Sequence, residues 1–311
     1  MALLDIINLR THYPSRDGLV KAVDAVDLQI ENEERLGLIG ETGCGKTVLG
    51  MSIIRLLLPT AVVSGRIIYK NRDLLTLGNE EMRRLRGKEI AMILQNPTTS
   101  LNPVLKVGDQ IAEVIELHQG LDKKQARAQA VKLLAKARID QAERRAGQYP
   151  HELSGGMKER VMIAMGLASQ PAFVIADEPT KGLDNRTKEE IIRLMREMTS
   201  GRSMLMITHD LTAAGEICDR IAVMYAGELL EEASADTIFR DPIHPYTRGF
   251  IGSLPGCGLH PIPGSSPSLI NPPHGCRFHP RCPQATDICK KEHPQMKELE
   301  KGHFVRCFLC T

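Results

Sequence analysis

The chain has 311 residues, of which 42% are hydrophobic and 25% are charged, so it can bury the core of one large domain or of two smaller ones. Its 40 basic and 38 acidic residues leave a net charge of +2, which argues against a general nucleic-acid-binding protein. The first ten residues include Asp5, Asn8 and Arg10 and make a poor signal peptide, and no apolar stretch reaches the roughly 18 residues of a membrane span. We therefore expect a cytoplasmic chain.

Short apolar runs rich in β-branched residues alternate with longer amphipathic stretches, which predicts an α/β fold with a parallel sheet covered by helices. The runs cover residues 36–39, 90–94, 173–176, 204–208 and 221–225. Residues 22–30 and 62–70 predict further strands in a smaller antiparallel flank. Ala226-Gly227 lies between 221–225 and a strand-like run at 228–232, which predicts a hairpin.

The middle and the end of the chain differ from this pattern. Residues 104–118 and 122–138 have helical spacing, so we expect a helical subdomain, about residues 96–160, inserted into the α/β core. Residues 255–283 are rich in proline and glycine and predict a loop-like arm. We therefore expect one domain over residues 1–240 and an extension over 241–311.

A phosphate-binding loop is the first motif with a chemical meaning. It follows the strand at 36–39, opens a helical run at 46–58, and reads Gly40-Glu41-Thr42-Gly43-Cys44-Gly45-Lys46-Thr47. Glycines let backbone N–H groups approach phosphates, and the helix N-terminus adds a favourable dipole. Lys46 is expected to reach the β- and γ-phosphates of ATP, and the Thr47 hydroxyl to hold Mg²⁺.

Two later motifs complete the expected site. The apolar strand at 173–176 leads into Asp177, a predicted Mg²⁺ ligand, and Glu178, which can orient or deprotonate the attacking water. Before it, Leu153-Ser154-Gly155-Gly156-Met157 precedes a helical run, so Ser154, Gly155 and Gly156 lie at a helix N-terminus that suits an anion. A single such element is also common as an ordinary helix cap, so the prediction depends on the combination.

In this order the motifs resemble those of the ATP-binding-cassette (ABC) family, over nearly the whole chain. The resemblance implies an ABC-type nucleotide-binding domain with the P-loop NTPase fold and three further site residues: Gln95 at the metal or water, Asp184 in the loop that faces a second subunit, and His209 at the γ-phosphate. It also implies that Ser154–Gly156 bind ATP held by that second subunit. Tyr13 is a candidate for stacking on adenine, with an ordinary loop or strand residue as the alternative.

Three further segments are similar to the ATP-binding subunits of oligopeptide and dipeptide importers, a group that includes nickel and metallophore importers. They are residues 95–103, 241–247 and 262–283. Met157 fits this branch, whereas Lys181-Gly182 departs from its usual Thr-Ala. The resemblance implies ATP hydrolysis coupled to peptide uptake at the cytoplasmic face of a membrane. Expected partners are a second, homologous ATPase subunit, two membrane permeases and, indirectly, a solute-binding protein. Alternatives are a nickel or metallophore importer and a soluble ABC ATPase in DNA repair or translation.

Five of the eight cysteines lie in the last 36 residues, and a cytosolic chain favours metal binding over disulfides there. The spacing matches neither a zinc finger nor a common ferredoxin, and four thiolates can hold either Zn²⁺ or an iron–sulfur cluster. Free thiols are a third alternative. Resemblance to members of this branch that carry a [4Fe–4S] centre implies four ligands: Cys276, Cys282, Cys289 and Cys307.

Overall fold

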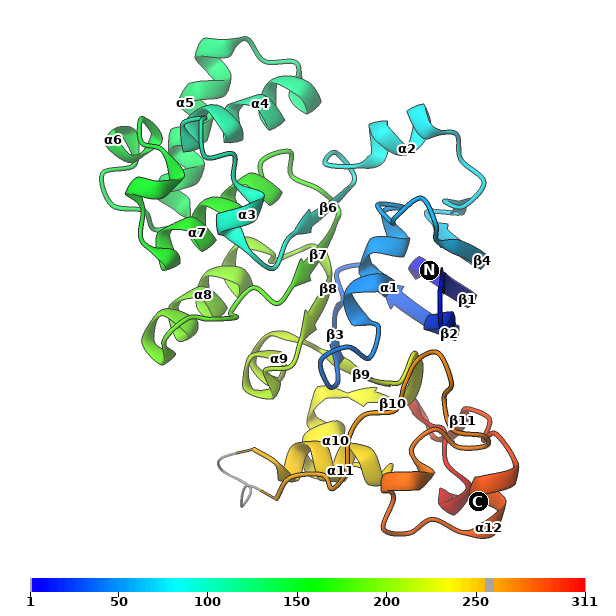
Figure 1. Ribbon diagram of the computed structural model, residues 1–311. Coiled ribbons are helices and arrows are strands. Elements are labelled where there is room, and N and C mark those ends of the chain that lie inside the picture. Colours follow the sequence, from blue (N-terminus) through cyan, green and yellow to red (C-terminus); the bar gives the residue numbers. More distant parts are fainter. Residues whose placement is uncertain (1, 255–259, 311) are drawn as a thin grey trace. The chain divides into compact units, whose positions relative to one another are not determined.

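The computed structural model describes residues 2–254 and 260–310, and its chain divides into two compact units (Figure 1). The first unit joins residues 1–77 to residues 206–311, and the second covers residues 78–205. Strand β8 (Ser203–Thr208) contains the boundary between them. No helix among the described residues is both long and apolar enough to cross a membrane.

An antiparallel sheet in the first unit confirms the expected flank. It consists of β1 (Ala2–Ser15), β2 (Gly18–Glu31), β4 (Val62–Tyr69) and β5 (Arg72–Asp73), in the order β2-β1-β4-β5. The sequence did not predict β1. Asn8 has a φ of 48°, and the register shifts between Ile6 and Leu9, so this bulge interrupts the alternation by which a strand is recognised.

A second set of strands in the same unit runs in the order β11-β12-β10-β9-β3. Here β3 (Arg35–Ile39) pairs in parallel with β9 (Arg220–Tyr225), which turns back into β10 (Glu228–Ser234). The predicted hairpin is confirmed, and its turn residues Ala226 and Gly227 both have positive φ. Strands β11 (Lys297–Glu300) and β12 (His303–Val305) were not predicted; they attach the end of the chain to β10.

The helices of the first unit are short. They are α1 (Lys46–Ile53), α9 (Leu211–Ile217), α10 (Ala235–Arg240), α11 (Pro245–Gly252) and α12 (Asp287–Lys291). Helix α1 ends five residues before the end of the predicted run at 46–58. Residues 260–283, the described part of the proline-rich arm, contain a single 3₁₀ turn at His279–Arg281 and are otherwise loop.

In the second unit, β6 (Ile90–Ile93) pairs in parallel with β7 (Phe173–Asp177). The predicted helices at 104–118 and 122–138 correspond to α4 (Val107–Gln119) and α5 (Lys123–Lys136), which Figure 1 shows in green beside α6 and α7. The other helices of this unit are α2 (Asn79–Leu85), α3 (Pro97–Ser100), α6 (Ala142–Ala146), α7 (Gly155–Gly166) and α8 (Asn185–Met198).

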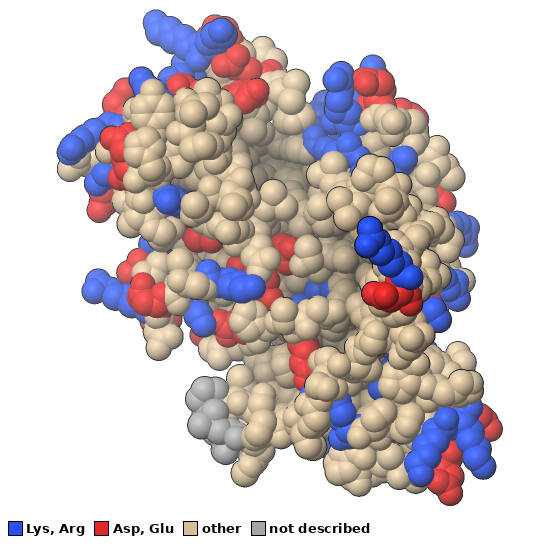
Figure 2. Space-filling model, viewed as in Figure 1, with Lys and Arg blue, Asp and Glu red and all other residues tan. Residues whose placement is uncertain are grey.

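Charged side chains of both signs are interspersed over the face drawn in Figure 2. Most charges of the second unit lie on such surfaces, but α7 buries two of them. Arg160 donates through Nη1 to the carbonyl of Ala137 (3.1 Å) and through Nη2 to Oε2 of Glu190 (2.7 Å). Glu159 is 1% exposed, and its Oε2 has no hydrogen-bond partner in the part of the chain that the structure describes. Burial raises the pKa of Glu159 to about 8.

Replacing Glu159 by Gln is expected to make stability less dependent on pH. Between the ordinary pKa of 4.5 and the folded pKa of about 8, the folded protein keeps this proton while the unfolded chain loses it. The free energy of unfolding of the wild type therefore falls as pH rises through that window. In urea titrations, E159Q should match the wild type closely at pH 5 and exceed it at pH 8 by on the order of 2 kcal/mol.

The matched control is Glu80→Gln, because Glu80 is 70% exposed and lies on a surface helix. E80Q should shift the free energy of unfolding equally at the two pH values. An E159Q effect of the same size at pH 5 and pH 8 would contradict the buried, protonated carboxyl.

Candidate functional site

The phosphate-binding loop lies where the sequence places it, between β3 and α1 in the first unit. Gly40 and Gly45 have φ of 151° and 112°, and the backbone approaches them too closely for a side chain. A Cβ at Gly40 would lie 2.1 Å from the carbonyl oxygen of Met224, and one at Gly45 would lie 2.0 Å from that of Ala22. Glycine is therefore required at both positions for the loop to keep its shape.

The ammonium group of Lys46 lies against this loop. Its Nζ donates to the carbonyl oxygens of Gly40 (2.7 Å) and Glu41 (2.9 Å), and the residue is 6% exposed. Thr47 is exposed in the first turn of α1, which contains no acidic residue and no side-chain cap. A buried cation beside glycine N–H groups and an uncapped helix N-terminus makes a site for a phosphate chain.

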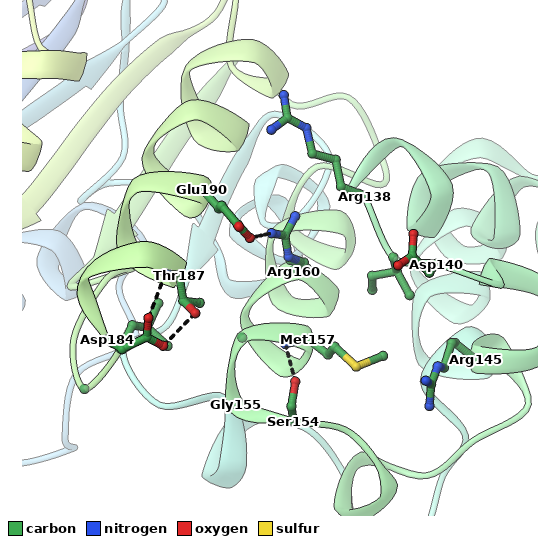
Figure 3. Close-up of a pocket in the computed structure, with 14 residues that line it drawn as sticks. Arg138, Asp140, Arg145, Ser154, Gly155, Met157, Arg160, Asp184, Thr187 and Glu190 are labelled. Carbon is green, nitrogen blue, oxygen red and sulfur yellow. Dashed lines mark hydrogen bonds and ion pairs between the residues drawn. The ribbon is translucent and has the colours of Figure 1, made fainter.

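The Ser154 element forms part of a pocket in the second unit (Figure 3). Ser154 caps α7, where its Oγ accepts a hydrogen bond from Met157 N (3.4 Å). Asp184 caps α8 in the same way, accepting from Thr187 N (3.0 Å) and Thr187 Oγ1 (2.7 Å). These hydrogen bonds from Thr187 lower the pKa of Asp184. A Cβ at Gly156 would lie 2.7 Å from Thr187 Cγ2, so the starts of the two helices approach closely.

This pocket has a volume of about 510 Å³ and brings together Ser154, Gly155, Gly156 and Asp184, which the sequence predicted separately. Three arginines that were not predicted also line it: Arg138, Arg145 and Arg160. Figure 3 shows Arg160 paired with Glu190 inside the pocket. Arg138 follows α5 and Arg145 lies in α6, and their spacing in sequence gives no signal for such a role. Their charges suit an anionic ligand.

The remaining predicted residues follow strands or lie on them. Asp177 is the last residue of β7, and Glu178 follows it with a φ of 50°; both are buried. Such a φ is uncommon for a residue with a side chain and often occurs at functional sites. Gln95 follows β6 and is half-buried, and His209 follows β8 and is exposed. Tyr13 pairs with Val20 between β1 and β2, so it is a strand residue.

The two units divide these residues between them. The loop from Gly40 to Thr47, Tyr13 and His209 belong to the first unit, and Gln95, Ser154–Gly156, Asp177, Glu178 and Asp184 belong to the second. In the first unit, Lys46 contacts the loop residues Gly40 and Glu41. In the second unit, the helix caps Ser154 and Asp184 line one pocket. The roles of the individual residues in a reaction remain predictions.

Four cysteines of the extension gather in the first unit. Cys276, Cys289 and Cys307 are buried, Cys282 is half-buried, and Cys276 N donates to the carbonyl of Cys289 (2.8 Å). Burial, with smaller contributions from Glu228, Cys289 and Cys307, raises the pKa of Cys276 to about 12. Burial also raises the pKa of Cys282, with smaller contributions from Cys307 and Cys289. The four sulfurs are thus close enough to interact electrostatically.

The same four cysteines do not form a ready site for a single metal ion. Among the side chains that the structure describes, no group of three or more His, Cys, Asp or Glu residues is arranged to hold one. Each of these four cysteines is a free thiol. The iron–sulfur cluster, and zinc as its alternative, therefore remain predictions.

Comparison with known proteins identifies two matching families. The family described as ABC transporter matches residues 23–181, and the oligopeptide/dipeptide transporter C-terminal region matches residues 230–289. An oligopeptide transport ATP-binding protein of Bacillus subtilis is 42% identical over 99% of this chain and 96% of its own length. A dipeptide transport ATP-binding protein of the same organism is 41% identical over 99% and 94%.

Solved structures give the same result. A dimeric ATP-binding cassette in a post-hydrolysis state, bound to ADP and Pi, matches with a TM-score of 0.68 at 27% identity. The match covers 75% of this chain and 98% of that one. CbiO1 of Clostridium perfringens, part of the ABC transporter complex CbiONQ, matches with a TM-score of 0.65 at 26% identity, over 77% and 91%.

Replacing Lys46 by Ala is expected to weaken the binding of MgATP by at least about tenfold, because a buried charge partner of the phosphates is lost. Titration with a fluorescent ATP analogue would measure the dissociation constant. Lys188→Ala serves as the control, because Lys188 lies on α8 in the other unit. K188A should bind MgATP with the affinity of the wild type. Unchanged binding by K46A would refute the assignment of the loop.

Proposed function

Because the chain belongs to the ABC transporter family and carries the C-terminal region of oligopeptide/dipeptide transporters, we propose that it is the ATP-hydrolysing subunit of a peptide importer. The nucleotide-binding domain occupies residues 1–240 and the transporter-type extension residues 241–311. The observation that carries this proposal is the arrangement at Lys46, where a buried ammonium meets a glycine loop at an uncapped helix N-terminus.

The reaction follows from the chemistry of the residues. Lys46 and the N–H groups of the loop bind the phosphates of ATP. The Thr47 hydroxyl, the Asp177 carboxylate and the Gln95 side-chain oxygen are hard donors of the kind that Mg²⁺ prefers, and bound Mg²⁺ neutralises charge on the phosphates. Glu178 accepts the proton of the attacking water, and His209 contacts the γ-phosphate.

The pocket at Ser154 and Asp184 serves a second subunit. The starts of α7 and α8 and three arginines line this pocket and suit the γ-phosphate of ATP held by that subunit. Two nucleotide domains would then close head to tail around ATP and reopen after hydrolysis. The dimeric cassette bound to ADP and Pi supports a dimer of nucleotide domains for a protein of the same fold. We propose a homologous ATPase as the partner, in preference to a second copy of this chain.

The transport complex is proposed to include two membrane permeases, with this chain at the cytoplasmic face of the membrane. An extracytoplasmic solute-binding protein delivers the cargo to the permeases. Di- and oligopeptides are the proposed cargo, because the relatives over nearly the whole chain are named for peptide, oligopeptide and dipeptide transport. Neither the nickel importer nor the soluble ATPase has a comparable observation in its favour.

Replacing Glu178 by Gln tests the mechanism in the assembled transporter. Loss of the general base is expected to lower ATP turnover by at least about a hundredfold while MgATP still binds. A tagged chain purified from solubilised membranes should retain the permeases and the partner ATPase, and E178Q should retain them equally. Reconstituted in liposomes with the binding protein, the wild type should take up labelled oligopeptide and E178Q should not.

The control is Glu189→Gln, since Glu189 lies on the surface of α8 with a 65% exposed side chain. E189Q should hydrolyse ATP and transport peptide at the wild-type rate. Near-normal turnover by E178Q would overturn the role of Glu178. ATP-dependent uptake of nickel in place of peptide would overturn the proposed cargo.

We further propose that Cys276, Cys282, Cys289 and Cys307 hold a [4Fe–4S] cluster. The support is their gathering within one part of the extension, with three of the four thiols buried. A cluster is wider than a single ion, so its ligands need not approach one another as closely as the ligands of Zn²⁺. When bound, it would join the loops of the extension and contribute to folding.

Anaerobically purified protein is therefore expected to be brown and to contain about four iron atoms per chain. Cys289→Ala should lose most of the iron. Cys218→Ala should keep it, because Cys218 is a buried thiol packed against Met206 and outside the group of four. A colourless wild-type preparation loaded with zinc would contradict the cluster.

A further inference from the structure

The extension reaches the nucleotide loop through one ion pair. We propose that Arg281 is a positioning residue for the phosphate-binding loop, which it holds through Glu41. This inference rests on the proposed ATPase function and adds a residue of the extension to its nucleotide site. Both residues belong to the first unit, so the contact lies within one compact body.

The ion pair between Arg281 and Glu41 is bidentate. Nη1 lies 2.9 Å from Oε2, and Nη2 lies 2.9 Å from Oε1. The two side chains are only 7% and 22% exposed, so solvent screens the pair weakly. The Ser266 hydroxyl, also from the extension, donates to Oε2 of Glu41. Paired N–H···O bonds of this kind fix both the distance and the orientation of the carboxylate.

A second contact holds the backbone of the same loop residue. Glu41 N donates to the hydroxyl of Tyr246 (3.0 Å), which belongs to α11. Tyr246 is fully buried against the rings of Tyr225 and Phe278, with centroids 4.6 and 5.4 Å away. The guanidinium of Arg281 lies over the Tyr225 ring, 5.8 Å from its centroid. Glu41 is therefore fixed by its backbone and by its side chain to an aromatic cluster that carries Arg281.

The position of Glu41 matters because its carbonyl oxygen accepts a hydrogen bond from Lys46 (2.9 Å). A shift of this residue would move a contact of the cation that binds the phosphates. Its carboxylate also places a negative charge beside an anion site. Paired with Arg281, that charge is neutralised and directed toward the extension; unpaired, it would repel the phosphates of ATP. Arg281 thus both places the loop and compensates its charge.

The backbone around Arg281 is set by the cysteine-bearing turn. Arg281 ends the 3₁₀ turn His279–Arg281, where its N–H donates to the carbonyl of Phe278 (3.0 Å), and Cys282 follows directly. Arg277, two residues before this turn, pairs with Asp24 and donates to the carbonyl of Ala226. The segment that carries two of the four cysteines therefore also carries the arginine that holds the loop.

A double variant distinguishes an effect of Arg281 on the nucleotide site from an effect on stability alone. It tests whether removal of the Glu41 charge restores the affinity for MgATP that R281A loses. R281A is expected to weaken MgATP binding about tenfold, the loss of one charge-assisted interaction. Removing the unpaired carboxylate in the double variant R281A/E41Q should restore the part of that affinity that is lost to charge repulsion, although the ion pair that holds the loop is still missing. R281K, which keeps the charge but not the paired geometry, should lie between R281A and the wild type. A purely structural arginine would give no rescue, because the second substitution restores no packing.

The measurement is the dissociation constant for MgATP by titration with a fluorescent analogue, with the unfolding temperature recorded for each variant. Arg240→Ala is the matched control, because Arg240 pairs with Asp236 on the exposed surface of α10 in the same unit. It should bind MgATP with wild-type affinity. If R281A does not fold, the E41D variant tests the inference in its place. This substitution shortens the side chain at position 41 by one methylene and leaves the extension unchanged. E41D should bind MgATP more weakly than E41Q.

The outcomes separate this inference from the function on which it rests. R281A and E41D binding within twofold of the wild type, with binding lost in K46A, would overturn the inference and leave the ATPase assignment in place. Weakened binding in R281A without rescue by E41Q would reduce Arg281 to a structural role and also overturn it. Unchanged binding in K46A would overturn the proposed function itself.

Discussion

The nucleotide loop depends on the close approach of two neighbouring backbones, which leave no room for a side chain at Gly40 or Gly45. Strand β9 approaches the loop at Gly40 through Met224, and β2 approaches it at Gly45 through Ala22. Asp24 N donates to the carbonyl of Gly227 (2.8 Å), and Gly227 N donates to the carbonyl of Cys44 (2.9 Å). One continuous path of hydrogen bonds therefore joins β2, the hairpin and the loop, and keeps Lys46 at the phosphate site.

The same hairpin is where the extension joins the first unit. Arg277 donates to the carbonyl of Ala226, and Tyr225 belongs to the aromatic cluster under Arg281. Further along, β12 pairs with β10, and Arg306 N donates to the carbonyl of Leu230 (2.8 Å). The extension and the phosphate loop thus share one support. A change in the conformation of the extension would therefore alter the contacts of Arg277 and Arg281 with the hairpin and the loop.

The starts of the helices differ in whether a side chain of the chain itself caps them. Helices α7, α8 and α9 begin at Ser154, Asp184 and Asp210, whose side-chain oxygens accept backbone N–H groups of the first turn. Helix α1 begins after Gly45, which has no side chain to offer. No side chain therefore caps the positive end of the helix dipole, and the buried ammonium of Lys46 beside it adds a charge that suits an anion.

Much of the fold and the order of the site motifs followed from the sequence, because strand alternation, helical spacing and glycine loops report local backbone demands. The strands, the helices at 107–136 and the hairpin at Ala226-Gly227 were predicted on this basis. Strand β1 was not predicted, because the bulge at Asn8 interrupts the alternation of apolar and polar residues along it. The strands β11 and β12 are too short to show an alternation of apolar and polar residues. They were therefore not recognised without the pairing of β12 to β10 and of β11 to β12.

The chemistry of the phosphate loop was thus determined by the sequence itself, since its residues are neighbours in the chain. What surrounds the loop was decided by tertiary structure. Arg281 and Glu41 are 240 positions apart, and no local spacing connects them. The three arginines of the Ser154 pocket likewise come together only through the packing of α5, α6 and α7. Local preference specifies which groups are available, whereas long-range packing specifies which of them meet.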